Sequence, residues 1–69
     1  MFNKEKLKEL MEKYDMPPAV LSYAMYNYGC QTSEQAIRTW LKGTSEPKYD
    51  KLEALAGVFK VTVNVFSRK

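Results

Sequence analysis

Apolar residues recur at the spacing of an α-helix in several separate stretches of this chain, and no other feature restricts its fold as much. The first stretch, residues 3–14, carries its apolar side chains on one face: Leu7, Leu10, Met11 and Tyr14. Lysine and glutamate occupy most of the other positions, which is typical of an amphipathic helix that buries one stripe. Asn3 stands at the start of the stretch and is predicted to be the N-cap.

The dipeptide Pro17-Pro18 separates this helix from a second one. Proline is poorly tolerated inside a helix but is common in its first turn, so the pair ends one helix and begins the next. Helical spacing then continues in a second set of residues: Val20, Leu21, Ala24, Met25 and Tyr28. Gly29 follows as a predicted C-terminal cap, so this helix is expected to end at about Tyr28.

Strong start and stop signals enclose the third stretch. Thr32 or Ser33 is predicted to cap it, and Thr32 with Gln35 fits the capping-box pattern. Its inward residues are predicted to be Ala36, Ile37, Trp40 and Leu41. Lys42-Gly43 places a basic residue in the last turn and a capping glycine after it. The sequence therefore predicts a helix over residues 33–42.

A turn at residues 44–47 precedes the fourth stretch, which begins near Lys48. Its apolar face is predicted to contain Leu52, Leu55, Ala56 and Phe59. Gly57 is a weak choice inside a helix and indicates either close packing or early fraying. We therefore expect one all-α domain over residues 1–69, a compact arrangement of four or five helices.

Residues 61–66 leave two alternatives open. Valine alternates here with polar residues, which favours a C-terminal β-strand. Thr62 can instead cap a short fifth helix. A strand would expose an edge able to pair with a second copy of the chain, and its apolar side chains would form that interface: Val61, Val63 and Val65.

The composition argues against several kinds of chemistry. The chain has one cysteine, Cys30, and no histidine, so it lacks a Cys/His zinc site, an internal disulfide and a histidine base for a cysteine nucleophile. We expect no enzymatic activity, no metal, no cofactor and no small-molecule ligand. No apolar run approaches the roughly 20 residues that span a membrane, and the first residues lack the apolar stretch of a signal peptide. A cytoplasmic protein that does not bind membranes is expected.

Two runs of residues, 37–47 and 52–61, carry a resemblance to a known family. They read Ile-Arg-Thr-Trp-Leu-Lys-Gly-Thr-Ser-Glu-Pro and Leu-Glu-Ala-Leu-Ala-Gly-Val-Phe-Lys-Val. This order resembles the pattern I-x-x-W-x-x-G-x-x-x-P…L-x-x-L-A-x-x-L-x-V of the phage repressor and Cro-like helix-turn-helix family, also called the xenobiotic-response-element family. Phe59 replaces the final leucine. The resemblance covers roughly residues 4–66.

The middle of the chain departs from the family pattern. Leu21-Ser22 stands where the family has Leu-Ala, and the distance from there to Ile37 exceeds what a connecting turn of about 3–4 residues allows. Pro18 also stands where relatives often carry a glutamine that contacts phosphate.

The resemblance implies sequence-specific binding of double-stranded DNA by a transcription regulator of the repressor or Cro type, of phage or prophage origin. Its second helix would enter the major groove. The outward positions of the predicted helix, and so the expected base contacts, are Ser33, Glu34, Gln35, Arg38 and Thr39. The resemblance places the first three where family members read bases. Phosphate contacts are expected from Lys42, Thr44, Ser45 and Lys48.

The chemistry of these side chains suits the expected contacts. Gln35 can pair with adenine, Glu34 can accept from cytosine N4, and Arg38 can reach guanine or a phosphate. The formal net charge of +3 is compatible with DNA, although Glu34 and Glu46 repel phosphates. Pairing two modules would raise affinity, so a homodimer is a further expectation.

Three tyrosines favour an alternative function. Tyr23, Tyr26 and Tyr28 lie close together in the second predicted helix, and tyrosine is enriched at the centres of protein interfaces. On this interpretation the helix-turn-helix scaffold is a protein-binding module, such as an antitoxin or an inhibitor of a host protein. A plainer alternative is that Tyr28 packs in the domain while the other two rings are half-exposed.

Overall fold

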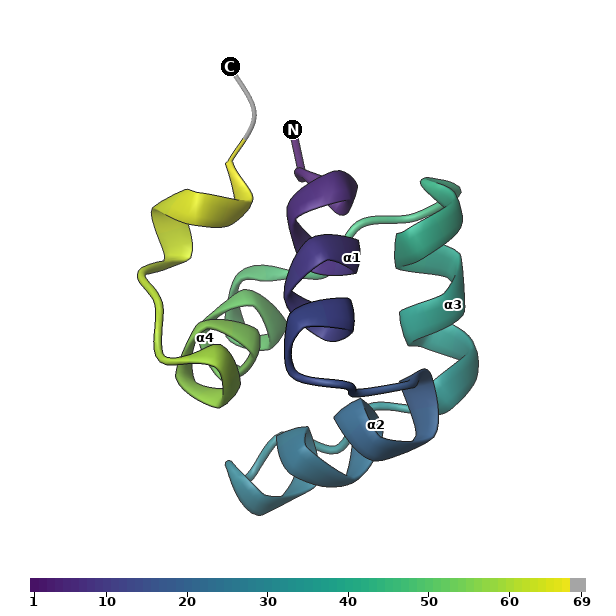
Figure 1. Cartoon of the computed structure of the whole chain (residues 1–69), viewed down its shortest axis with the longest axis vertical. Helices are drawn as coiled ribbons and strands as arrows, with labels where there is room; N and C mark the ends of the chain where they lie inside the picture. Colours follow the sequence, from purple (N-terminus) through teal and green to yellow (C-terminus); the bar gives the residue numbers. More distant parts are fainter. Residues whose placement is uncertain (68–69) are drawn as a thin grey trace.

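Four α-helices and one 3₁₀ turn make up the computed structural model, which describes residues 1–67 (Figure 1). They are α1 (Lys4–Lys13), α2 (Pro18–Asn27), α3 (Glu34–Lys42), α4 (Tyr49–Phe59) and η1 (Val63–Phe66). Helix α1 stands between α3 on one side and α4 with η1 on the other, and α2 crosses beneath them (Figure 1). The all-α architecture expected from the helical spacing is confirmed.

A single core joins all five elements. Its buried apolar side chains are Leu7, Leu10, Met11, Leu21, Met25, Ile37, Trp40, Ala54, Leu55, Ala56, Phe59 and Phe66. Helix α1 packs against α3 and η1, while α2 packs against α3 and α4. Because each helix buries only a narrow stripe, a large part of its surface stays available to solvent.

Every α-helix ends in the same hydrogen-bonded motif, closed by a residue with a positive φ angle. Gly29 (φ 79°) and Gly43 (φ 86°) close α2 and α3, as predicted. Asp15 (φ 54°) and Lys60 (φ 57°) close α1 and α4. In each case the next residue donates its N–H to a carbonyl five positions back, as Met16 does to Met11 at 2.8 Å. This is the Schellman arrangement, which satisfies carbonyl groups that the helix leaves free.

The helix starts are less uniform than the helix ends. Asn3 is confirmed as an N-cap, since its side-chain oxygen accepts from the N–H of Lys6 at 3.1 Å. Ser33 caps α3 by accepting from Ala36 N at 3.1 Å. The capping box predicted for Thr32 is therefore wrong, because the side chain of Thr32 is buried and bonded elsewhere. Lys48 stands at the start of α4 without a side-chain cap.

Three apolar residues that were expected on buried faces are exposed. Tyr14 lies just beyond the end of α1 and is exposed, although its ring stacks on that of Phe59 with the centroids 5.9 Å apart. In α2 the buried stripe consists of Leu21 and Met25 alone. Val20, in α2, and Tyr28, its C-cap, are exposed.

Residues 61–66 do not form the predicted strand. Residues 63–66 make the 3₁₀ turn η1, and the only strand-like pairing within residues 1–67 is a single antiparallel bridge between Phe2 and Ser67. Residues three apart lie on the same side of a 3₁₀ helix, so the turn directs both Val63 and Phe66 toward the core. Phe66 is buried and stacks on Phe2, with ring centroids 5.8 Å apart.

This turn also removes the predicted dimer edge. The three valines of the segment are partly buried against the domain's own core: Val61, Val63 and Val65. The backbone of Phe66 is used inside the chain as well, since its carbonyl accepts from Asn3 N at 2.7 Å. Of the two alternatives for residues 61–66, the short helix is therefore closer to the observed structure than the strand. Among the described residues, no helix has the length and apolar character to cross a bilayer.

Candidate nucleic-acid interface

Helix α3 is held from the inside and at both ends. Ile37 is fully buried and Trp40 is only 4% exposed, so the inner face of α3 belongs to the core. Ser33 caps its first turn. At the other end the ammonium group of Lys4, in α1, donates to the carbonyl of Lys42 at 3.2 Å. The helix therefore presents a defined outer face.

The first two turns of that outer face carry polar side chains. Ser33 and Gln35 are exposed, although the Ser33 hydroxyl is engaged by the cap. Arg38 forms an ion pair with Glu34, one turn earlier in the same helix. The two side chains are 53% and 43% exposed, so this is a surface pair in which solvent screens the attraction. The Glu34 carboxylate offsets the charge that Arg38 would offer to DNA.

Thr39 does not face outward freely as the prediction had it. Its hydroxyl donates to the carbonyl of Ala36 at 2.7 Å and lies 2.8 Å from the hydroxyl of Ser45. Since Thr39 has one hydroxyl proton, Ser45 is the donor in the second bond. Thr44 adds a bond from its hydroxyl to the carbonyl of Thr39 at 3.3 Å. Thr39 thus folds the turn that follows α3 back onto the helix.

The predicted phosphate contacts lie at and beyond the far end of α3. Lys42, Thr44, Ser45 and Lys48 are all exposed. A helix rises about 1.5 Å per residue, so Ser33 and Lys42 lie roughly 13 Å apart along the axis of α3. The structure brings Thr39, Thr44 and Ser45 together, while Ser33 and Gln35 lie at the opposite end. The predicted base contacts therefore lie on α3 and its N-cap, and the predicted phosphate contacts run from the last residue of α3 to the start of α4.

The connection between α2 and α3 is anchored by a residue whose role sequence reasoning missed. Thr32 is buried; its carbonyl accepts from the hydroxyl of Ser22, in α2, and its own hydroxyl accepts from the ammonium of Lys51, in α4, at 3.0 Å. Lys51 also donates to the carbonyl of Gln31. Residues 28–33 thus make an ordered link longer than the helix-turn-helix turn of about 3–4 residues.

Three tyrosines, two in α2 and one at its C-cap, are a second group of exposed residues. Tyr23 is 69% exposed, Tyr26 63% and Tyr28 57%, so none of these rings is a core residue. One edge of Tyr28 does contact α4 at Gly57. A sequence signal marks this group, because residues 16–33 contain no aspartate, glutamate, lysine or arginine. An uncharged and exposed aromatic helix is unusual in a domain with 28% charged residues.

Comparison with known proteins adds no relative. The chain matches no protein-family model, no curated protein and no solved structure. Over residues 1–67 the structure defines an all-α domain of four helices with a 3₁₀ turn.

Proposed function

We propose that this chain binds double-stranded DNA by inserting α3 into the major groove, and that it is a transcription regulator of the repressor or Cro type. The observation that carries the proposal is the placement of α3. Its inner face is locked in the core by Ile37 and Trp40, and its outer face is open and polar. An α-helix fits the major groove, where each base pair displays a distinct pattern of donors and acceptors.

Two side chains of the outer face suit base recognition. The side chain of Gln35 is exposed and takes no part in capping the helix, so its amide can pair with adenine. Arg38 can take guanine once it leaves Glu34. An exposed ion pair one turn apart is worth about 0.3–0.5 kcal/mol. A good bidentate contact to a base is worth about 1–3 kcal/mol, so the exchange favours DNA.

The backbone contacts come from the region after α3. Lys42 and Lys48 are exposed cations on either side of the turn that Thr39 and Ser45 hold together. The start of α4 lacks a side-chain cap, so its first N–H groups are available to an anion. Helix α2 has no cation to offer a phosphate. We therefore place the phosphate contacts at residues 42–48 rather than on α2.

The test is fluorescence anisotropy with duplexes selected by the protein from a random pool. Arg38→Ala should weaken binding about tenfold, the loss of one good contact, and leave the melting temperature nearly unchanged. Lys13→Ala is the matched control, since it removes one positive charge at the end of α1, where Lys13 lies over the ring of Tyr14. Equal losses of affinity in both variants would mean that only the net charge of the protein matters, which would contradict a role for α3. A failure to select any duplex at low salt would reject DNA binding.

The exposed tyrosines support a second candidate function, protein binding through α2. A second copy of the chain is the simplest partner, because uncharged surfaces can meet around a two-fold axis without like-charge repulsion. Sedimentation equilibrium of the wild type and of Tyr23→Lys tests this. A concentration-dependent dimer that the substitution abolishes supports the interface. A monomer over the whole concentration range rejects a homodimer.

A further inference from the structure

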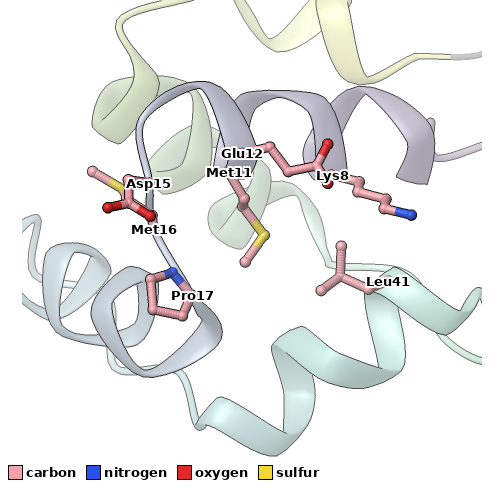
Figure 2. Close-up of a pocket in the computed structure, with 7 residues that line it drawn as sticks. All are labelled: Lys8, Met11, Glu12, Asp15, Met16, Pro17 and Leu41. Carbon is pink, nitrogen blue, oxygen red and sulfur yellow. The ribbon is translucent and has the colours of Figure 1, made fainter.

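The two ends of α3 are fixed to different parts of the fold. The C-terminal end is held by α1, where Lys4 donates to the carbonyl of Lys42. Met11 of α1 and Leu41 of α3 line the same hollow at this end (Figure 2). The N-terminal end lies beside α2, and the link of residues 28–33 runs back along α2 to reach it (Figure 1). The position of the first turn of α3 therefore depends on how this link is held.

Lys51 holds the link from α4. Its ammonium group donates to the carbonyl of Gln31 and, at 3.0 Å, to the hydroxyl of Thr32. The two acceptors belong to the residues that directly precede Ser33, the N-cap of α3. The largest contacts of α4 are with η1 and α2, so its hold on the start of α3 comes through these two hydrogen bonds.

Thr32 is the centre of this junction. It is buried, and its carbonyl accepts from the hydroxyl of Ser22 in α2. Because the hydroxyl oxygen of Thr32 accepts from Lys51, its proton can go to the Sγ atom of Cys30, 3.8 Å away. Helices α2 and α4 thus both hold the residue that stands directly before the N-cap of α3.

We propose that Lys51 is a positioning residue for DNA recognition: by holding the link it fixes the first turn of α3, from which Gln35 reaches a base. The inference rests on the proposed function. A recognition site needs its side chains held to within about 0.5 Å. Phosphate contacts carry no sequence information, so freedom in this turn lowers affinity for a preferred sequence more than for DNA in general. The ammonium of Lys51 is engaged inside the protein, unlike the exposed lysines of the proposed phosphate contacts.

The first test needs no DNA. Lys51→Met keeps the length of the side chain and removes its donors, whereas Lys51→Arg keeps donors. Amide hydrogen exchange, followed by NMR, compares the N–H groups of Ala36 and Ile37 at the start of α3 with that of Gly43 at its end. The methionine variant should exchange about tenfold faster at the start alone, and the arginine variant should resemble the wild type. Thr32→Val removes one acceptor and gives the same comparison if the methionine variant does not fold. Equal loss of protection at both ends, or no loss at the start, would overturn the proposal.

The second test compares duplexes that the wild type selects from a random pool with random-sequence duplex. Lys51→Met should lower the preference for selected duplex about tenfold, and Lys51→Arg should recover most of it. Lys60→Met, the control, removes the same charge at the other end of α4 and should leave the preference unchanged. An unchanged preference in Lys51→Met would overturn the proposal. Equal losses on both duplexes, with a salt slope smaller by about one, would also overturn it, because Lys51 would then be a phosphate contact. A wild type that selects no duplex rejects the proposed function, while the exchange experiment still decides whether Lys51 holds the turn.

Discussion

The ring of Tyr28, just after α2, lies against the backbone of Gly57 in α4, so closely that a methyl group at residue 57 would come within 2.6 Å of the Cε1 atom of Tyr28. Gly57 is therefore an interior helix residue chosen for close packing. Fraying is not its cause, since α4 continues to Phe59. This contact fixes the end of α2 against α4, at the start of the link that leads to α3.

Gly57→Ala should show whether this contact restricts the sequence. Alanine is favoured over glycine inside a helix by about 1 kcal/mol. We expect no gain in the wild-type background, because the new methyl must displace the ring of Tyr28. In a Tyr28→Ala background the same substitution should stabilise the domain by about 1 kcal/mol. Urea unfolding of the four proteins measures the coupling. Equal effects in both backgrounds would contradict the contact.

Lys60 closes α4 with φ 57°, a conformation that costs a side chain other than glycine about 1–2 kcal/mol. Lys60→Gly should therefore stabilise the domain, by about 0.5–1 kcal/mol after the greater chain entropy of unfolded glycine is subtracted. Thermal and urea unfolding measure the gain. Lys60→Ala, the control for loss of the side chain, should bring no such gain. A destabilised glycine variant would mean that the lysine side chain itself contributes to the fold.

Trp40 anchors α3 in the core at 4% exposure, and Trp40→Ala should cost about 3–5 kcal/mol. That is comparable to the whole stability of so small a domain, about 3–5 kcal/mol, so far-ultraviolet circular dichroism should report an unfolded chain. Trp40→Phe keeps most of the apolar volume and should stay folded with a lower melting temperature. Normal melting of the alanine variant would refute the core placement.

The ion pair between Glu34 and Arg38 predicts that a substitution at Glu34 strengthens DNA binding, whereas Arg38→Ala weakens it. Glu34→Gln frees Arg38 and removes a charge that repels phosphates, so binding to a random-sequence duplex should tighten about two- to fivefold. Glu53→Gln is the control, because residue 53 is exposed on α4 away from α3. Unchanged or weaker binding of the Glu34 variant to random duplex would contradict this view of the pair.

Features that depend on a few neighbouring residues were predictable from the sequence. Asn3 and Gly43 cap their helices as expected, because a cap needs only its own first or last turn. Asp15 and Lys60 adopt the same left-handed conformation as the glycines, but their residue types do not predict it. In both cases the residue that follows, Met16 or Val61, is apolar and partly buried against the core.

Features that depend on distant residues were not predictable. The alternation in residues 61–66 favours a strand, yet the stacking of Phe66 on Phe2 and the bond to Asn3 make the segment a turn. Within the candidate interface, the ion pair of Arg38 follows from its spacing to Glu34 along the helix. The spacing does not predict that the hydroxyl of Thr39 is engaged inside the chain, because this depends on how the turn after α3 folds back onto the helix.

Binding of the wild-type chain to duplex DNA across a range of salt concentrations tests the central claim most directly. If Lys42 and Lys48 meet phosphates while Arg38 takes a base, the logarithm of the binding constant should fall linearly with the logarithm of salt, with a slope of about −2. Isothermal titration or anisotropy provides the constants. The account predicts that slope and its reduction by about one unit in Lys48→Ala. Absence of binding at low salt, or binding indifferent to salt, would contradict it.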